Sequence, residues 1–233
     1  MPPTQATDLL SLTPDDLDLA LKEHFKARGQ PAYRSAQVRR WIYEGLAPSI
    51  EQMTDLPVGE REALHDRFAM VEAETAQVAL SEDGTVKHLW RLADGELIES
   101  VLIPSRKRMT LCISSQAGCA IGCTFCATGW GGFDRQLTAG EIVSQYRASR
   151  RWAERNGHGR ITNIVYMGMG EPLANQEAVL ASLTILNRGY GVGARRITVS
   201  TVGLVPGIRE LAARPEQFGL ALSLHAPVSD LRA

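Results

Sequence analysis

Long apolar runs are absent from this 233-residue sequence. No stretch approaches the ~20 consecutive apolar residues that a membrane-spanning helix needs. The first residues, Met-Pro-Pro-Thr-Gln-Ala-Thr-Asp, contain neither the basic segment nor the apolar segment of a secretory signal. These absences predict a cytoplasmic protein without a membrane partner.

An excess of charge of either sign is also absent. Lys and Arg number 25, Asp and Glu number 26, and the formal net charge is −1. Net charge therefore neither favours nor excludes nucleic acid, so only local patches can do so. One patch interleaves basic and aromatic residues, namely Lys22, Lys26, Arg28, Tyr33, Arg34, Arg39, Arg40, Trp41 and Tyr43. It is suited to RNA phosphates and bases, or it is a solvated helix face over core aromatics.

A second basic segment, Arg106-Lys107-Arg108, is a further candidate for RNA contact. It directly precedes the segment that carries all the cysteines. We expect it to lie near the active site.

Cysteine is scarce, and its four copies are not spread along the chain. Cys112, Cys119, Cys123 and Cys126 all lie within fifteen residues. A disulfide framework would distribute its cysteines to join distant segments. In a chain without a secretory signal, such clustering indicates a metal or redox site.

The order of elements predicts three parts. Residues 1–72 are predicted to form a helical domain, with helices after Thr13, over 35–45 and over 60–68. Residues 73–104 are predicted to form an antiparallel β meander, because Asp-Gly turns at 83–84 and 94–95 separate β-rich runs. From residue 105 onward, strands alternate with helices.

This third part, residues 105–233, has four predicted strands over 110–115, 161–167, 196–201 and 218–225. Its helices are predicted over 138–155, 175–188 and 206–213, the first opened by a Thr138–Glu141 capping box. Such alternation predicts right-handed βαβ units in a parallel sheet or barrel, and hence an α/β fold. A four-stranded parallel sheet leaves an edge uncovered, so we expect the chain to be incomplete at its C-terminal end.

The cysteines Cys119, Cys123 and Cys126 follow the first of these strands in a C-x3-C-x2-C pattern. Structural zinc usually takes four protein ligands. Four-iron clusters are also commonly held by four cysteines, and three would leave one iron open to a small molecule. A zinc knuckle or three buried free thiols remain the alternatives.

This pattern resembles that of the radical S-adenosylmethionine (SAM) superfamily. The resemblance extends to the RlmN-type adenine C2 methyltransferases and their Cfr-type relatives, and it covers nearly the whole chain from about Leu17. The segments that carry it are Gln30–Arg34, Met53–Leu56, Ser81–Thr85, Glu99–Pro104, Ser114–Gly129, Met167–Leu173 and Ser223–Pro227.

The resemblance implies a partial radical SAM (β/α) barrel, with four of the expected six strands, preceded by the helical domain and the meander. It implies a [4Fe-4S] cluster on Cys119, Cys123 and Cys126, with SAM on its open iron. Implied SAM-binding residues are Gly170, Glu171, Ser200, Ser223, Leu224 and His225. Without the resemblance, 168–172 reads as a strand-to-helix turn, and the serines and His225 as polar residues at a sheet rim.

Two catalytic roles are implied by resemblance alone. Cys112 would be the thiol that resolves a covalent protein–RNA intermediate by forming a disulfide, although most lone strand cysteines are small buried hydrophobes. Glu99 would be a proton acceptor, although a strand carboxylate usually faces solvent.

The implied activity is methylation of C2 of adenosine in 23S rRNA and tRNA, in a monomer that takes electrons from a donor such as flavodoxin. In the resembled mechanism a cysteine near the C-terminus carries the methyl group, and no cysteine follows Cys126 here. We therefore expect this chain alone to be inactive. A C8-type relative and a non-catalytic iron–sulfur or RNA-binding remnant are the alternatives.

Overall fold

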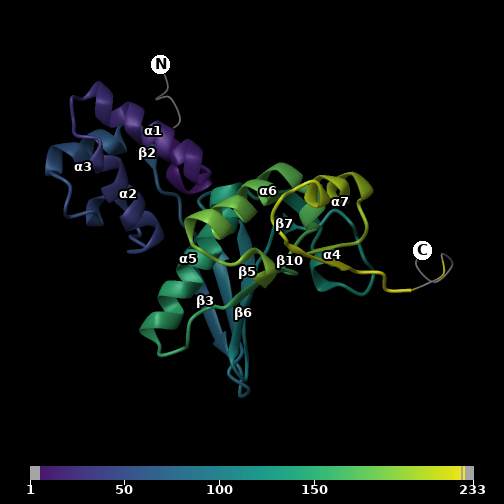
Figure 1. Cartoon of the computed structure of the whole chain (residues 1–233). Helices are drawn as coiled ribbons and strands as arrows, with labels where there is room; N and C mark the ends of the chain where they lie inside the picture. Colours follow the sequence, from purple (N-terminus) through teal and green to yellow (C-terminus); the bar gives the residue numbers. More distant parts are fainter. Residues whose placement is uncertain (1–5, 227, 229–233) are drawn as a thin grey trace.

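The computed structural model describes residues 6–226 and residue 228. A helical domain at the N-terminus adjoins a larger α/β part, and the two lie side by side (Figure 1). The end of the 223–227 motif and the last five residues lie outside the described part. Within that part, no helix has the length and apolar character needed to cross a membrane.

Three helices form the N-terminal domain: α1 (Pro14–Ala27), α2 (Tyr33–Tyr43) and α3 (Val58–His65). The Thr13 hydroxyl caps α1 by accepting a hydrogen bond from the Asp16 N–H, which confirms the predicted helix start. Short 3₁₀ turns, η1 (Leu9–Ser11) and η2 (Ile50–Gln52), and a parallel pair of two-residue strands, β1 (Thr7–Asp8) and β2 (Phe68–Ala69), complete the domain. It has its own hydrophobic core, which includes Leu17, Leu21 and Phe25.

A seven-stranded mixed sheet dominates the α/β part, in the order β11-β10-β9-β6-β5-β4-β3. Its antiparallel half comprises β3 (Glu74–Leu80), β4 (Val86–Arg91) and β5 (Leu97–Ser105). Its parallel half comprises β6 (Arg108–Cys112), β9 (Asn163–Tyr166), β10 (Ile197–Thr201) and β11 (Gly219–Leu222), which confirms the four predicted strands. Because β5 pairs antiparallel with β6, the meander and the parallel strands form one continuous sheet.

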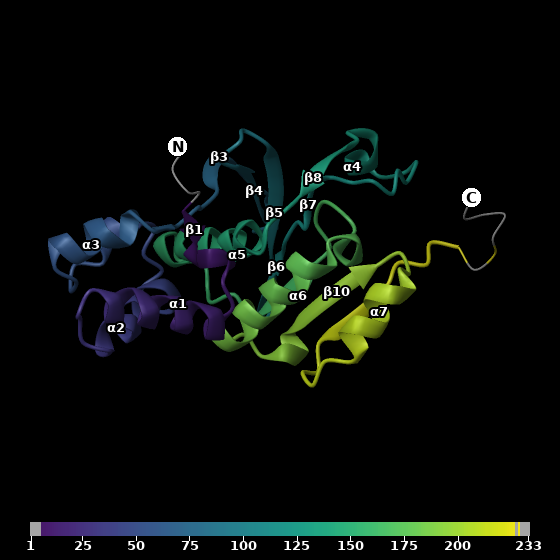
Figure 2. The ribbon, with the colours of Figure 1, turned by 90° about the horizontal axis from the view of Figure 1, so that it is seen from above.

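Helices cover one face of the parallel strands (Figure 2). They are α5 (Ala139–Arg155), α6 (Gln176–Thr184) with its π-helical continuation η4 (Ile185–Gly189), and α7 (Val205–Ala212). The Thr138–Glu141 capping box is present, as predicted. On the covered face Ile164, Tyr166 and Val199 are fully buried, whereas Val165 and Thr198 on the opposite face are only half-buried.

A separate two-stranded sheet was not predicted from the sequence. Strands β7 (Gln116–Gly118) and β8 (Phe133–Gln136) pair antiparallel and enclose the loop that holds three cysteines and the single-turn helix α4 (Ala127–Trp130). Two further 3₁₀ turns, η3 (Pro172–Ala174) and η5 (Ala194–Arg196), lie between the later strands.

Gln145 on α5 locks the helix to the ends of two strands. Its amide oxygen accepts hydrogen bonds from the Ser114 N–H and from the Ser100 hydroxyl, both at 2.8 Å, and its amide nitrogen donates to the Ser114 carbonyl at 2.9 Å. All of these groups are buried. A buried polar group that finds every partner in this way holds its neighbours in one arrangement. The segment that leads into the cysteine loop is therefore anchored to α5.

Arg147, also on α5, joins the helical domain to the sheet part. Its guanidinium is fully buried and donates to the carbonyls of Ile42 and Ala47, to the Tyr190 hydroxyl and to the Glu72 carboxylate. Close packing accompanies these bonds, since a Cβ on Gly189 would lie 2.5 Å from the Tyr43 ring. The two parts are thus held by a buried, fully paired cation.

Candidate active site

A cavity of about 510 Å³ lies beyond the carboxyl ends of β9, β10 and β11. Ligands of parallel α/β sheets bind at this edge, because loops from several strands converge there. Three groups of predicted residues line the cavity: the cysteines Cys119, Cys123 and Cys126; the glycine–glutamate pair Gly170 and Glu171; and the polar residues Ser200, Ser223 and His225. Residues distant in sequence therefore meet at a single cavity.

The cysteine loop is closed by backbone hydrogen bonds at its base and within it. The Cys119 N–H donates to the Gly132 carbonyl at 2.7 Å, and the Cys126 N–H donates to the Cys123 carbonyl at 3.1 Å. Gly118 has a φ of +75°, and a Cβ there would lie 2.2 Å from the Gly132 oxygen. Only glycine fits this position, so the sequence around the first cysteine is set by the closure of the loop.

The three thiols of this loop are half-buried and face the same cavity. The backbone N–H of Gly129, helped by Thr128, lowers the pKa of the Cys126 thiol, which favours the thiolate form that binds metals. Among the described residues, no three Cys, His, Asp or Glu side chains converge closely enough to hold a metal. The three cysteines are thus free thiols that are not gathered as metal ligands in this structure. Three thiols at one cavity are nevertheless the type of donor that an iron–sulfur cluster takes.

The loop after β9 closely approaches residues 113–116, the segment that joins β6 to β7. A Cβ on Gly168 would lie 2.7 Å from the Ile113 carbonyl carbon, and a Cβ on Gly170 would lie 2.5 Å from the Gln116 side chain. Gly170 also has a φ of +96°. The Met169 N–H donates to the Ser114 hydroxyl at 2.9 Å. These contacts explain why glycines flank this loop and fix its backbone at the cavity wall.

The Glu171 carboxylate is buried and already carries two hydrogen bonds. One oxygen accepts from the Leu173 N–H at 3.0 Å and the other from the Val202 N–H at 2.8 Å. It thereby caps η3 and ties the loop to the end of β10. A carboxylate has about four acceptor positions, so about two remain for a ligand in the cavity.

Two serines face each other across the ends of the last two strands. The hydroxyl oxygens of Ser200 and Ser223 lie 2.9 Å apart and are hydrogen-bonded. His225 has a φ of +61° and its ring lies 4.7 Å from that of Phe125, which links the segment after β11 to the cysteine loop. Leu224 is 44% exposed and does not line the cavity.

The two residues predicted to be catalytic lie on the sheet beside the cavity and do not line it. Cys112 is at the end of β6, where burial raises its pKa to about 11, while the Met167 N–H opposes the rise. Glu99 on β5 forms an exposed ion pair with Lys87 at 2.9 Å. Its carbonyl accepts a hydrogen bond from the Ser114 hydroxyl, so Glu99 lies at the same end of the sheet as the cavity.

Other residues of the site were not predicted from the sequence. The Gln116 amide oxygen accepts a hydrogen bond from the Glu171 N–H at 2.8 Å, and its amide nitrogen donates to Gln136 at 2.9 Å. Asn175 donates to the carbonyls of Ser115 and Leu137. Amide side chains directly after a strand were the available signal, but only the fold shows which backbone groups they reach.

The basic segment 106–108 is not near the site, so that prediction is wrong. It comprises the turn between β5 and β6 and the first residue of β6, at the opposite end of this strand from the cysteine loop. The strand runs from Arg108 to Cys112, which separates the two by about 13 Å at the usual rise per residue.

Comparisons with known proteins agree with this geometry. Residues 113–232 match the Radical SAM superfamily, and residues 7–70 match the ribosomal RNA large subunit methyltransferase N-terminal domain. Proteins named probable dual-specificity RNA methyltransferase RlmN are similar to this chain. The one from Gemmatimonas aurantiaca is 50% identical over 231 residues, which cover 98% of this chain and 63% of that protein.

The corresponding protein from Rhodopirellula baltica is 48% identical over 216 residues, which cover 91% of this chain and 57% of that protein. The crystal structure of a radical SAM methyltransferase from Sphaerobacter thermophilus is similar with a TM-score of 0.89 and 46% identity, covering 97% of this chain and 66% of that one. This chain thus spans about three fifths of the length of the curated relatives that it matches. The resemblance inferred from the motifs is confirmed, and the chain belongs to the radical SAM superfamily.

Proposed function

We propose that this chain forms the cluster-binding loop and part of the SAM-binding wall of a radical SAM enzyme that methylates C2 of adenosine in RNA. The observation that carries the proposal is the meeting of Cys119, Cys123 and Cys126 with the 168–171 loop at a single cavity. The N-terminal match and the names of the relatives support RNA as the substrate class, with 23S rRNA and tRNA as the substrates.

In this proposal the three thiolates hold a [4Fe-4S] cluster, and SAM occupies the cavity beside it. When bound, the cluster supplies one electron for the reductive cleavage of SAM. The free acceptor positions of Glu171 and the hydroxyls of Ser200 and Ser223 would bind polar groups of SAM. The tilted ring pair of His225 and Phe125 would close the side of the cavity next to the cysteine loop.

The proposed roles of Cys112 and Glu99 concern protons. Because burial raises the pKa of Cys112 to about 11, its sulfur stays protonated at neutral pH. A thiol in this state does not react prematurely, but it must lose its proton before it can resolve a covalent adduct. Glu99 at the same end of the sheet is proposed to accept a proton once its ion pair with Lys87 opens.

The division into residues 1–72, 73–104 and 105–233 is proposed to reflect an RNA-binding-type domain, a connecting meander and the radical SAM core. We expect a monomer in the cytoplasm that receives electrons from a donor such as flavodoxin. The matched segment at 7–70 supports the first boundary.

Cluster assembly tests the proposal directly. Anaerobically reconstituted chain should contain about four irons and four sulfides, as in a cubane cluster. Replacement of Cys119, Cys123 or Cys126 by alanine should abolish the cluster and its visible absorption. Cys112→Ala is the matched control and should keep it, since Cys112 does not line the cavity. Stoichiometric zinc without iron–sulfur absorption would overturn the proposal.

Methylation must be assayed with the whole protein, because this chain spans about three fifths of its relatives. In a host without its own enzyme, RNA should gain 2-methyladenosine, detected by mass spectrometry of nucleosides. Formation of 8-methyladenosine would identify a C8-type relative instead. The cysteine variants should produce neither.

A further inference from the structure

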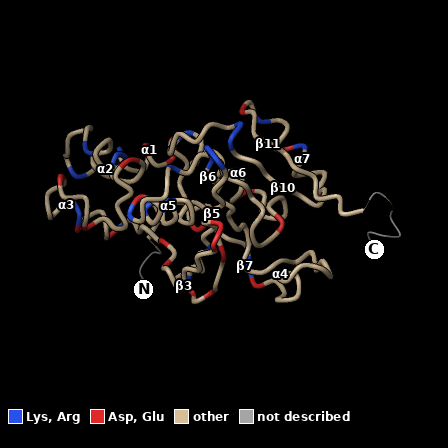
Figure 3. The backbone as a smooth tube through the Cα atoms, turned by 90° about the horizontal axis from the view of Figure 1, so that it is seen from below, with Lys and Arg blue, Asp and Glu red and all other residues tan. Residues whose placement is uncertain are grey.

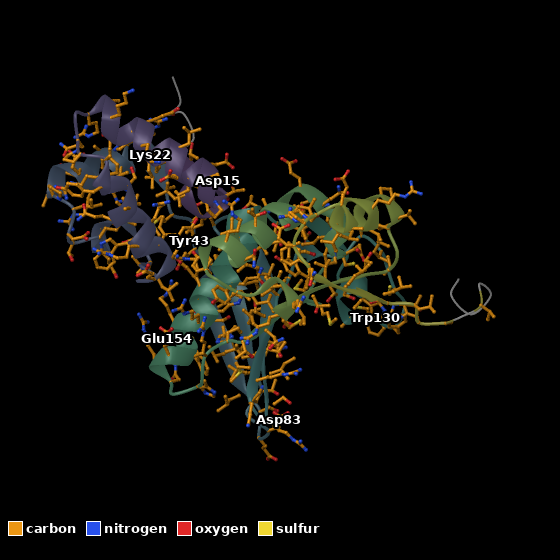
Figure 4. All side chains as sticks on the ribbon, in the orientation of Figure 1. Asp15, Lys22, Tyr43, Asp83, Trp130 and Glu154 are labelled. Carbon is orange, nitrogen blue, oxygen red and sulfur yellow. The ribbon has the colours of Figure 1, made fainter. Side chains whose placement is uncertain are left out.

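A groove of about 550 Å³ lies at the end of the sheet remote from the cysteine loop. Three segments line it: the β3–β4 turn at Asp83, the β5–β6 turn, and the loop between α5 and β9. Figure 4 shows Asp83 at the tip of the hairpins, far from Trp130 beside the cysteine loop. Four exposed cations line this groove, and we call them the turn patch: Arg106, Lys107, Arg108 and Arg160.

The charges of the turn patch are not compensated. Within residues 6–226, none of the four side chains forms an ion pair or a hydrogen bond with another residue of the chain. The one carboxylate in the groove, Asp83, accepts hydrogen bonds from Thr85. Figure 3, in which Lys and Arg are blue, shows blue segments of the backbone beside the label of β6. A local positive potential therefore exists in a chain whose net charge is −1.

Basic residues of the helical domain differ in this respect. Lys22 and Arg39 both pair with Asp18, Arg40 pairs with Asp55 at 2.6 Å, and Arg28 pairs with Glu60 at 3.0 Å. Lys22 and Arg39 therefore share one carboxylate. Among the described residues, Lys26 and Arg34 of the same cluster form no ion pair, although Arg34 donates hydrogen bonds to Gln37 and to the Asp55 carbonyl. Four of the six cations in the predicted RNA-contacting cluster of the helical domain are thus paired with carboxylates, whereas none of the four cations of the turn patch has such a partner among the described residues.

Arg106 adds a second, independent observation. It has a φ of +42° in a two-residue turn between β5 and β6, a position that normally takes glycine or asparagine. A residue with a Cβ in this conformation costs about 1–2 kcal/mol. A long cation held at such a position, where glycine would suit the turn better, suggests a role outside the fold.

We propose that the turn patch binds the phosphate backbone of RNA at a point remote from the cysteine cavity. The proposal rests on the proposed function, which supplies RNA as the substrate class. Exposed Arg and Lys side chains without intramolecular partners are the groups that bind phosphates and release counterions. Because the patch lies about 13 Å or more beyond Cys112, it contacts a different part of the RNA from the nucleotide that reacts.

An acidic protein is the other class of partner that a basic groove could attract. An electron donor must approach the cluster, which the proposed function puts at the opposite end of β6. Four of the ten residues that line the groove are cations, which suits the regularly charged phosphate backbone of RNA. These observations favour RNA.

The test measures the affinity of the chain for a fluorescein-labelled RNA stem-loop of about 16 base pairs. Salt is varied from about 50 to 200 mM, because each lost phosphate contact should reduce the slope of log K against log salt by about 0.7–0.9. Replacing all four patch residues by glutamine should weaken binding about one hundredfold at 100 mM salt and lower the slope by two units or more. Thermal unfolding of each variant confirms that it is folded.

A matched pair of double variants separates position from charge. Lys107→Gln with Arg160→Gln and Arg39→Gln with Arg40→Gln each remove two positive charges. The turn-patch double variant should weaken RNA binding about tenfold or more, and the helical-domain double variant about twofold or less. Equal losses of RNA affinity in the two double variants would overturn the proposal, since the net charge of the chain alone would then explain binding.

Three other results would also overturn the proposal. They are an unchanged RNA affinity in the folded quadruple variant, no salt-dependent RNA binding by the parent chain, and binding of poly-L-glutamate that is as tight as RNA and equally dependent on the patch. None of these results depends on the cluster. Failure of the proposed function would show separately, as missing iron–sulfur absorption or missing methyladenosine in the assays above.

Discussion

The two ends of strand β6 contrast sharply in how their side chains are held. At the carboxyl end, Ser114 and Gln116 lie in a network of buried hydrogen bonds that reaches Gln145 and Glu171. At the other end, the cations of the turn patch are exposed and have no partner among the described residues. Only a few residues separate the two ends.

This contrast teaches which parts of the chain are committed to positioning and which are free to bind. A buried polar group must have its partners inside the protein, so substituting one group disturbs several others. An exposed cation is solvated, so its loss changes the surface potential and leaves the fold intact. The carboxyl end suits chemistry that needs fixed geometry, and the opposite end suits electrostatic attraction of a large anion.

The largest difference between the two ends should appear in stability. Gln145→Leu keeps the approximate volume but leaves the Ser114 N–H, the Ser114 carbonyl and the Ser100 hydroxyl without their buried partner. The free energy of unfolding should fall by about 3 kcal/mol or more, measured by urea denaturation. Lys107→Ala, at the exposed end, should change it by no more than about 0.5 kcal/mol.

The Gln145 variant should also disturb the cavity, because Ser114 contacts the 168–171 loop through the Met169 N–H. Cluster content after reconstitution should therefore fall in this variant and not in Lys107→Ala. Equal stability of the two variants would show that the buried network does not hold the carboxyl end, and the contrast between the ends would then fail.

Sequence patterns predicted the elements that carry strong local signals. The Thr138–Glu141 capping box and the Asp-Gly turns at 83–84 and 94–95 all lie where the structure has a helix start or a β turn. The fold class and the resemblance to RlmN-type enzymes are confirmed. Capping and turn signals act within a few residues, so they can be recognised in a single short segment of sequence.

The pairing of strands across a long loop could not be predicted in the same way. The β7–β8 hairpin has strands of only three and four residues, too short for a periodic pattern, and the fourteen residues 119–132, which include three cysteines, separate the two strands. Nearness in sequence also misled the prediction for Arg106–Arg108, since a strand carries its two ends to opposite edges of the sheet. The roles predicted for Glu99, Cys112, Leu224 and the SAM-contacting residues stay predictions.

A smaller difference should appear in pH dependence: the stability of the sheet should vary with pH, whereas RNA binding by the turn patch should not. His88 on β4 is buried and stacks on Trp90 with ring centroids 4.7 Å apart, and neither of its ring nitrogens has a hydrogen-bond partner among the described residues. Burial, with a contribution from His158, lowers its pKa from 6.5 to about 4. The folded state therefore favours the neutral ring. The stabilisation is complete above pH 6.5 and is lost as the pH falls toward 4.

Between pH 7.5 and pH 5, His88 should account for a loss of about 2 kcal/mol in unfolding free energy. His88→Phe keeps the aromatic stack and should remove this part of the pH dependence, measured by urea denaturation at both pH values. RNA binding by the turn patch should not follow this titration, because arginine and lysine keep their charge throughout the range. An identical pH dependence in parent and variant would exclude a neutral buried ring as the cause.

The smallest effect concerns two single variants of the turn patch, for which we expect changes in stability of opposite sign. Arg106→Gly replaces a residue at φ +42° by glycine, which adopts this conformation without a steric penalty. It also removes the charge repulsion between residue 106 and its neighbours Lys107 and Arg108. Relief of this strain exceeds the added entropy of glycine in the unfolded chain, so the protein should gain about 0.5–1 kcal/mol in stability. Arg108→Gly removes the same charge from a residue on strand β6, where glycine costs about 0.5–1 kcal/mol, so this variant should be destabilised.

Both variants should nevertheless bind RNA more weakly, by up to about eightfold at 100 mM salt, because each loses one phosphate contact. A turn residue with a purely structural role would show stability and RNA binding changing together. Opposite shifts in thermal unfolding with parallel losses in RNA affinity would instead separate what Arg106 costs the fold from what it contributes to binding.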